Sequence, residues 1–585
     1  MSSSLGYPSV GHRVLDIPEI IEQILQYLDV KNNIRNAAVC KRWRDIALNL
    51  AWRHVSDIVL LFHALAPLVR VEPGDGNAYQ TFNFARPLRA SDWEHFRKFA
   101  FRVRSLTYGS HFGPIRRDLS VLAFDEVARN RPPFNVLPAI LPHLQELEWL
   151  PHQFGRLEYS LMFMHDKMTK FTVELFKEDP YPIQSLFDEI RLRMPDLLHL
   201  DLRFVFSMRD IEDDAVALFG ALTKLKKIIL PVFTITSGVM EALSKLPNLG
   251  TVQFEYVDWQ GKGDCNDVLP FAPRLEDGAF PSLWDLSLST TIRDIATFTT
   301  ADFAPTNITH LYIHVLDTAS PSELNQFLIA ISENCQLLTD LYITMTKYPA
   351  YTPEDIAPSG SGPTWETLKP LLSCPNLVHF QLVWDQPVKM TQENMEELAV
   401  KWPSLEVLYL NCEPLFPIED STLTLRALLP LARHCPKLRE LGLYVSTDGH
   451  DLSTKDGSTV MPFKNLKVLN FGLSRISDPN PAALFLSEIC PLGCDVVSGV
   501  TWPDDLSPSL ESEEQTSDWP QHWEEVGKLL PILTTLRMEE GAKRKALEKE
   551  VGELRKQCRA LAMSAIGHEN AVTSGLGPND SCILL

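Results

Sequence analysis

Near the N-terminus, hydrophobic residues recur at the three- and four-residue steps of a helix. The residues at these steps are Ile17, Ile20, Ile21, Ile24, Leu25 and Leu28. This spacing predicts an amphipathic helix, opened by Pro18, because proline suits the first helical turn. Two further short helices are predicted before Trp52. Three such helices cannot bury this much apolar surface alone, so the segment indicates either a docking surface or a helical cap on a larger domain.

A second pattern, apolar-x-x-apolar-x-apolar, recurs along the middle of the chain. Its clear copies begin at Leu144, Leu197, Leu225, Leu249, Leu283, Ile308, Leu338, Leu377, Leu405, Leu438 and Leu466, and weaker copies begin at Val103 and Met168. The alternation predicts a short strand with one buried face in each copy. Helical stretches lie between the copies, one of them opened by a capping box from Ser320 to Glu323. A strand and a helix repeated in this way predict a leucine-rich-repeat solenoid, and hence an α/β fold.

Side chains that alternate with the buried leucines should point into the concave face, where solenoids bind partners. The candidate substrate-binding residues on that face are His199, Arg203, His310, Tyr312, His314, Tyr342, His379, Tyr409 and Tyr444. We expect Tyr312, Tyr342 and Tyr409 to share one column. Tyrosine offers a large contact area at low entropic cost. The alternative is that aromatic residues are present there because they favour strands.

Cysteines precede three of the predicted strands, at Cys335, Cys374 and Cys435. None of them belongs to a C-x-x-C pair, which a metal site of this kind would need. We therefore predict buried, space-filling thiols, no metal site and no cofactor.

Beyond the repeats, residues 501–520 are acidic and serine-rich, which predicts a disordered linker. Residues 521–562 then predict a helix. Within it Leu547, Val551, Leu554, Cys558 and Leu561 follow a 4-3-4-3 step, which indicates either a short coiled coil or a helix packed on the solenoid.

The segment 563–585 is expected to be a flexible tail. It ends in Cys582-Ile-Leu-Leu, which matches a C-a-a-X prenylation box of the geranylgeranyl type. Our hypothesis is that Cys582 is lipidated and attaches the chain to membranes. The alternative is a disordered tail whose apolar end has no role.

The 585 residues predict several domains or a repeat array. The net charge of −21 disfavours binding to nucleic acids or anionic membranes. No secretion signal or membrane-spanning run is evident, and the ten cysteines are sparse, so we expect reduced thiols and a cytoplasmic or nuclear location. The chain contains no P-loop, H-E-x-x-H, G-x-S-x-G or dinucleotide motif. We therefore predict a protein that is not an enzyme, although a hydrolase with an unrecognised site is a distant alternative.

Residues 11–55 resemble the F-box, the small helical module that docks on the Skp1 adaptor of cullin-RING ubiquitin ligases. The resemblance rests on Pro18-Glu19, the apolar Ile24 and Leu28, the cluster from Val39 to Trp43 and the late Trp52. Ile17 stands where a leucine is usual, a conservative departure. The resemblance implies that the adaptor-binding residues are Ile17, Pro18, Ile20, Ile24, Leu28, Val39, Cys40 and Trp43.

With a helical connector at 56–100 and a solenoid at 101–500, the whole chain resembles the F-box and leucine-rich-repeat substrate receptors of filamentous fungi. This resemblance implies the substrate-recognition subunit of an SCF (Skp1–cullin–F-box) ubiquitin ligase, whose repeats bind a target protein. The alternative is a leucine-rich-repeat scaffold outside any ligase, in which the N-terminal helices only cap the array.

Overall fold

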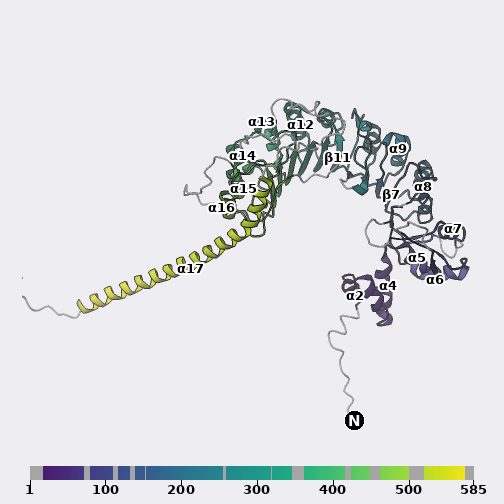
Figure 1. The fold of residues 1–585 in the computed structure, drawn as a ribbon, viewed down its shortest axis with the longest axis horizontal. Coiled ribbons are helices and arrows are strands. Elements are labelled where there is room, and N and C mark those ends of the chain that lie inside the picture. Colours follow the sequence, from purple (N-terminus) through teal and green to yellow (C-terminus); the bar gives the residue numbers. More distant parts are fainter. Residues whose placement is uncertain are drawn as a thin grey trace, which may run out of the picture. The chain divides into compact units, whose positions relative to one another are not determined.

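The chain forms two compact units, Met1–Ile356 with Glu366–Asn376, and Ala357–Trp365 with Leu377–Leu585. In the computed structural model (Figure 1), the described residues are 17–71, 79–109, 116–131, 139–151, 153–254, 258–317, 319–345, 362–414, 423–447, 461–499 and 519–573.

The first unit begins with three short helices, α2 (Pro18–Leu25), α3 (Val30–Asn36) and α4 (Lys41–Arg53). Pro18 occupies the first turn of α2, as predicted, and the Asp29 carboxylate caps α3 by accepting from the Asn32 backbone N–H at 2.7 Å. The helices meet around a small apolar core formed by Ile21, Leu25, Ala37 and Ala47.

A long parallel sheet follows, in which each strand of the first unit pairs with the next repeat. Its strands are β1 (His54–Val55), β4 (Ser105–Tyr108), β6 (Glu146–Trp149), β7 (Lys170–Glu174), β8 (His199–Arg203), β9 (Lys227–Ile229), β10 (Thr251–Gln253), β11 (Asp285–Thr290), β12 (His310–Val315) and β13 (Asp340–Met345). The two weaker sequence copies, at Val103 and Met168, thus also contain strands, β4 and β7.

Register explains why the apolar pattern recurs. One row of side chains crosses adjacent strands and is buried throughout, comprising Phe171, Leu200, Ile228, Val252, Leu286, Leu311 and Leu341. Because side chains alternate along a strand, the residues on either side of this row point to the opposite face of the sheet. We call that opposite face the open face.

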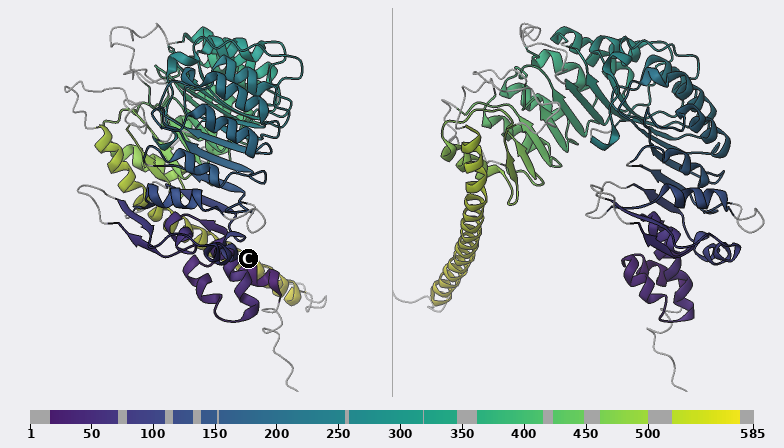
Figure 2. Two further views of the ribbon diagram at one scale, coloured as in Figure 1. Left: turned by 90° about the vertical axis from the view of Figure 1, so that its right-hand side faces the viewer. Right: turned by 45° about the vertical axis from the view of Figure 1, so that its right-hand side comes forward.

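Helices cover the other face of the sheet in this unit (Figures 1 and 2). They are α5 (Ile58–His63), α6 (Ala90–Ala100), α7 (Val121–Arg129), α8 (Ile183–Arg193), α9 (Glu212–Ala221), α10 (Ser237–Ser244), α11 (Ile292–Thr300) and α12 (Pro321–Asn334), followed by the short α13 (Trp365–Leu368). The capping box predicted at α12 is confirmed, because the Glu323 N–H donates to Ser320 Oγ at 3.2 Å and the Ser320 N–H to Glu323 Oε2 at 2.9 Å.

The connector at 56–100 differs from the predicted all-helical segment. Besides α5 and α6 it holds β2 (Leu68–Arg70) and β3 (Tyr79–Phe84). These strands pair with each other and with β5 (Arg116–Leu119) in a separate small sheet. The pairing of β3 with β5 is remote in sequence, which is why local periodicity did not predict it.

The second unit continues the same construction with β14 (His379–Val383), β15 (Val407–Leu410), β16 (Glu440–Leu443), β17 (Val468–Asn470) and β18 (Asp495–Val497). Its helices are α14 (Gln392–Lys401), α15 (Leu428–His434), α16 (Pro479–Ile489) and α17 (Trp519–Thr573). The predicted fold class is confirmed: an N-terminal helical domain precedes a parallel-sheet solenoid and a C-terminal helix. The predicted acidic linker, except for its last residues, lies outside the described residues. The predicted flexible tail, 563–585, begins inside α17, which continues to Thr573, and the part from residue 574 lies outside the described residues.

Candidate protein-binding surfaces

The three N-terminal helices divide their apolar residues between a core and an exposed surface. Ile21 and Leu25 are 1% and 2% exposed, and Trp43 packs against the core from its edge. The buried Asn33 side chain donates to the backbone carbonyls of Leu25 and Leu28 at 3.0 and 3.2 Å. These contacts fix the end of α2 against α3 and hold the remaining apolar residues outward.

Seven large apolar side chains of this small domain are exposed to solvent. They are Ile17 (43% exposed), Ile24 (47%), Tyr27 (85%), Leu28 (39%), Val30 (47%), Ile34 (52%) and Val39 (63%). We call this set the apolar surface of the N-terminal domain. So many exposed apolar residues in one small domain mark an interaction site, since single exposed residues are normal but groups of them are not.

The structure places most of the predicted adaptor-binding residues on the outside. Ile17, Pro18, Ile24, Leu28, Val39 and Cys40 are exposed, whereas Ile20 and Trp43 are only half-exposed. Sequence reasoning missed Tyr27, Val30 and Ile34 as members of the apolar surface. Their signal was present in the sequence: each is apolar, Tyr27 just beyond α2 and Val30 and Ile34 on α3.

Basic side chains accompany the apolar surface. Lys31, Arg35, Lys41 and Arg44 are all exposed on α3 and α4. Apolar residues with charged neighbours are the usual composition of a protein–protein interface.

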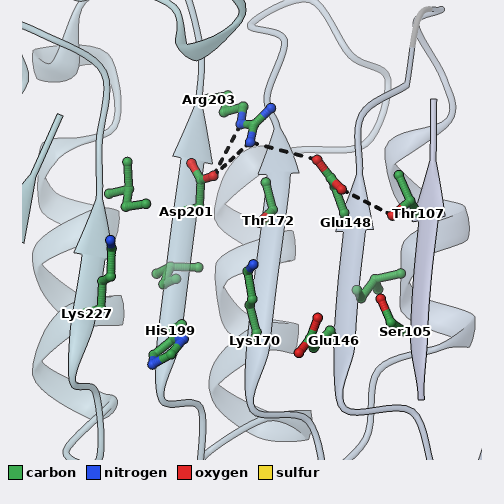
Figure 3. A pocket seen from close by; sticks show the side chains of 13 residues that line it. Ser105, Thr107, Glu146, Glu148, Lys170, Thr172, His199, Asp201, Arg203 and Lys227 are labelled. Carbon is green, nitrogen blue, oxygen red and sulfur yellow. Dashed lines mark hydrogen bonds and ion pairs between the residues drawn. The ribbon is translucent and has the colours of Figure 1, made fainter. Parts of the chain in front are cut away.

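The open face of the first unit has a hollow of about 430 Å³ across β4, β6, β7, β8 and β9 (Figure 3). At its upper end in this view, Arg203 lies against Asp201 at 3.0 Å and against Glu148 at 3.8 Å. Thr107 donates to Glu148 at 3.1 Å. Arg203, predicted to bind substrate, is therefore already neutralised by two carboxylates of its own chain.

The lower end of the hollow carries a row of basic residues in register, Lys170, His199 and Lys227, with Glu146 at one side. Burial lowers the pKa of His199, and Lys170 and Lys227 lower it further. His199 is therefore neutral at pH 7, and the two lysines supply the positive charge of the row.

Glu174 lies on the same face at the end of β7, paired in register with Arg203. Burial raises its pKa from 4.5 to about 7, opposed by the Arg203 charge. The folded chain thus holds this proton more tightly than the unfolded chain does. The resulting stability is present in full below pH 4.5 and is lost as the pH rises through about 7.

As the pH rises through about 7, the native chain should lose the stability that protonated Glu174 provides. We therefore expect the Tm of Glu174→Gln to fall less than that of the native chain over this pH range. The measurement is the difference in Tm between the native chain and the variant at several pH values, with the exposed Glu178→Gln as the control. The native chain should lose Tm relative to Glu174→Gln as the pH rises. Parallel Tm curves for these two proteins would contradict the assignment.

Other candidates on the open face are engaged with their neighbours. His310 Nε2 lies 3.2 Å from Asp340 Oδ2. The rings of Tyr312 and Tyr342 stack with their centroids 5.8 Å apart, which confirms their shared column. His379 and Tyr409 are half-buried on β14 and β15, where Tyr409 lies in register with Gln381.

Two of the predicted substrate-binding residues are buried, and the prediction for them is wrong. His314 is fully buried, stacks on Phe233 at 5.1 Å between ring centroids, and has its pKa lowered to about 3 by burial. Phe233 lies between β9 and α10 and belongs to an apolar cluster with Cys265 and Val268 of η4 (Cys265–Val268). Tyr444, which follows the last residue of β16, is only 5% exposed, and the next backbone N–H, that of Val445, donates to Ser474 Oγ at 2.9 Å.

The predicted space-filling thiols, Cys335, Cys374 and Cys435, are buried, and burial raises their pKa values to about 12, 11 and 12. Among the described residues, no group of three or more histidine, cysteine or acidic side chains is arranged to bind a metal ion. No helix in that part of the chain has the length and apolar character needed to cross a bilayer. Cys582, the predicted lipidation site, lies outside the described residues.

Comparison with known proteins gives one sequence match and a distant structural likeness. The F-box-like family matches residues 18–57. The search of curated proteins gives no match. Among solved structures, the chain is similar to the Rad7–Elc1 complex of yeast, with 11% sequence identity over 85% of this chain and 91% of that chain, and a TM-score of 0.28. From its family match at residues 18–57, the chain carries an F-box-like domain at the start of its repeat body.

Proposed function

We propose that this protein is the substrate-recognition subunit of an SCF-type ubiquitin ligase, in which the F-box-like domain docks a Skp1-type adaptor and the solenoid binds a target protein. The observation that carries the proposal is the apolar surface of the N-terminal domain, which lies outside the core of a matched F-box-like domain. In this proposal the chain is a non-catalytic subunit of the ligase.

Docking would remove the apolar surface from water. Apolar area transferred into an interface stabilises a complex by about 25 cal/mol per Å² before the costs of association are subtracted. Because Ile24 and Leu28 are half-covered by their own domain, they are already held in place and lose little side-chain freedom on binding. The basic residues of α3 and α4 would speed association with an acidic adaptor.

The rival function is a scaffold whose N-terminal helices only cap the repeats. A cap directs its apolar residues into the array, as the inward-facing Ile21 and Leu25 do within their own core. The seven exposed residues are not used in this way, which favours docking over capping.

The test is calorimetric titration of a purified Skp1-type adaptor into the full chain. We expect saturable binding with one adaptor per chain. Absence of binding by a chain that melts cooperatively would reject the ligase proposal and favour the scaffold.

For the target, we propose that the hollow on the open face binds an acidic segment. Arg203 is neutralised by its neighbours, whereas Lys170 and Lys227 form no ion pair within the described part of the chain, so these two lysines are the cations left to meet a partner. A bound target would be held at a high effective concentration near the ubiquitin-loaded enzyme, which is how a receptor without catalytic residues accelerates transfer.

Lys170→Glu with Lys227→Glu should therefore reduce target capture at least tenfold, while adaptor binding is unchanged. The matched control is Lys464→Glu with Lys467→Glu, exposed lysines of the second unit. Quantitative mass spectrometry of proteins that co-purify with each form is the measurement. Equal capture by the two double variants would reject the hollow as the target site.

A further inference from the structure

The C-terminal helix continues far beyond the part that packs on the repeats. Trp523, Val526 and Leu530 are buried against the body of the second unit. In contrast, every residue from 542 to 563 is exposed except the half-buried Gly552. This outer part of α17 is long, and an isolated helix is only marginally stable in water unless something packs against it.

One stripe of the outer helix is apolar. It consists of Leu547, Val551, Leu554, Cys558 and Leu561, four of which are 45–68% exposed apolar residues and the fifth an exposed thiol. The steps between them are four, three, four and three residues. In a heptad this assigns Leu547, Leu554 and Leu561 to d positions and Val551 and Cys558 to a positions. We call this stripe the α17 seam.

We propose that the α17 seam pairs with the same seam of a second copy of this chain, as a parallel two-stranded coiled coil in register. The choice of two strands follows from the core residues. A β-branched residue at a with leucine at d favours two strands over three or four, and Val551 lies between Leu547 and Leu554 in this order.

The charges beside the seam favour a second copy in the parallel orientation. In a parallel pair, each g residue meets the e residue five positions later on the other helix. Lys543 would then meet the second copy's Glu548, and Glu550 would meet the second copy's Arg555. Both pairs are of opposite sign, and symmetry makes each pair occur twice.

An antiparallel pair would use these charges less well. There e residues face e residues and g residues face g residues, so Glu548 could still meet Arg555. Glu550, however, would lie opposite the neutral Gln557. Within the chain itself, Arg544 pairs with Glu548 at 3.7 Å and Lys556 with Glu553 at 3.3 Å. Among the described residues, Lys543, Glu550 and Arg555 form no ion pair, so their charges are available to a second copy.

Disulfide formation by Cys558 distinguishes a parallel pair of α17 helices from an antiparallel pair. At an a position of a parallel, in-register pair it faces the Cys558 of the second copy, so the two thiols are within reach of a disulfide. In an antiparallel pair of the seam they lie in different layers. Two thiols that exchange with glutathione disulfide give the protein disulfide and two molecules of glutathione, which balances protons and electrons.

The first experiment uses the full chain with Cys40→Ser and Cys582→Ser, which leaves Cys558 as the exposed thiol beside seven buried cysteines. In a glutathione redox buffer we expect a disulfide-linked dimer on a non-reducing gel, lost in Cys558→Ser. Leu554→Asp should slow its formation at least tenfold. The matched control is Met563→Asp, since Met563 is also an exposed apolar residue of α17 but occupies an f position outside the seam.

The second experiment tests the charge pairs without any disulfide. Light scattering under reducing conditions should give the mass of a dimer for the native chain and a larger monomer fraction for Glu550→Lys. Adding Arg555→Glu to that variant restores an opposite-sign pair and should restore the dimer. Two results would overturn the proposal. One is a chain that stays monomeric at all concentrations and whose Leu554→Asp and Met563→Asp variants crosslink equally. The other is a dimer in which Cys558 does not crosslink.

Discussion

Replacing Ile24 and Leu28 together by aspartate is expected to abolish adaptor binding and leave the chain folded. Buried apolar anchors at the centre of an interface each contribute about 2 kcal/mol or more, so losing both should weaken binding by more than about 100-fold. The two side chains are 47% and 39% exposed in the free chain. Their replacement should therefore change the free energy of unfolding by no more than about 0.5 kcal/mol. Calorimetric titration and thermal unfolding measure the two quantities.

Two further variants of α2 and its C-terminal end serve as controls for this double replacement. Gln26→Asp adds a carboxylate at an exposed position about 200° around α2 from Ile24, so it should bind the adaptor normally, unlike Ile24→Asp. Ile21→Asp should instead unfold the domain, because Ile21 is 1% exposed and its replacement would bury a charge. A repeat body that melts early in the Ile24→Asp/Leu28→Asp variant would instead indicate the cap of a scaffold.

The second large effect is expected at the root of the C-terminal helix. Trp523 is fully buried, its ring stacks on Phe471 with centroids 4.0 Å apart, and its indole N–H donates to the Ser474 carbonyl at 2.8 Å. Trp523→Ala would remove this stacking, leave a cavity and orphan the carbonyl. Such a change costs about 3–5 kcal/mol.

We expect this loss to appear as release of α17 from the second unit. Amide hydrogen exchange should accelerate along the root of the helix and in α16, while α8 to α12 of the first unit remain protected. Leu536→Ala is the control on the same helix, because Leu536 is 53% exposed. Unchanged exchange at the root of α17 in Trp523→Ala would show that the other buried residues suffice to hold the helix.

The repeat strands and the N-terminal helices were predictable because each is a local pattern with one buried face. Alternation along the sequence places Leu200 and Leu286 in the core, and it places His199 and Ser287 on the open face. Helical spacing likewise located α2. Spacing did not show which of its two adjacent apolar stripes forms the core, because Ile21 and Ile24 satisfy the same periodicity. Only the packing of α3 and α4 decides between them.

Local alternation did not predict the surroundings of two side chains on the open face, His314 and Arg203. His314 has the correct register for an exposed position, yet Phe233, from the segment between β9 and α10, stacks on its ring. Arg203 is accessible by register, but Asp201 of its own strand and Glu148 of β6, two strands away, form ion pairs with it. The ring stacked on His314 and the carboxylate of Glu148 near Arg203 both come from residues remote in sequence. Strand register predicts which face a side chain takes and not what else lies on that face.

The most direct test of the ligase account is hydrogen–deuterium exchange of the full chain with and without a Skp1-type adaptor. If the apolar surface of the N-terminal domain docks the adaptor, exchange should slow in α2, α3 and the start of α4, and the repeat strands should be unaffected. Slowed exchange on the open face alone, or no change in α2 and α3 at saturating adaptor, would contradict the account.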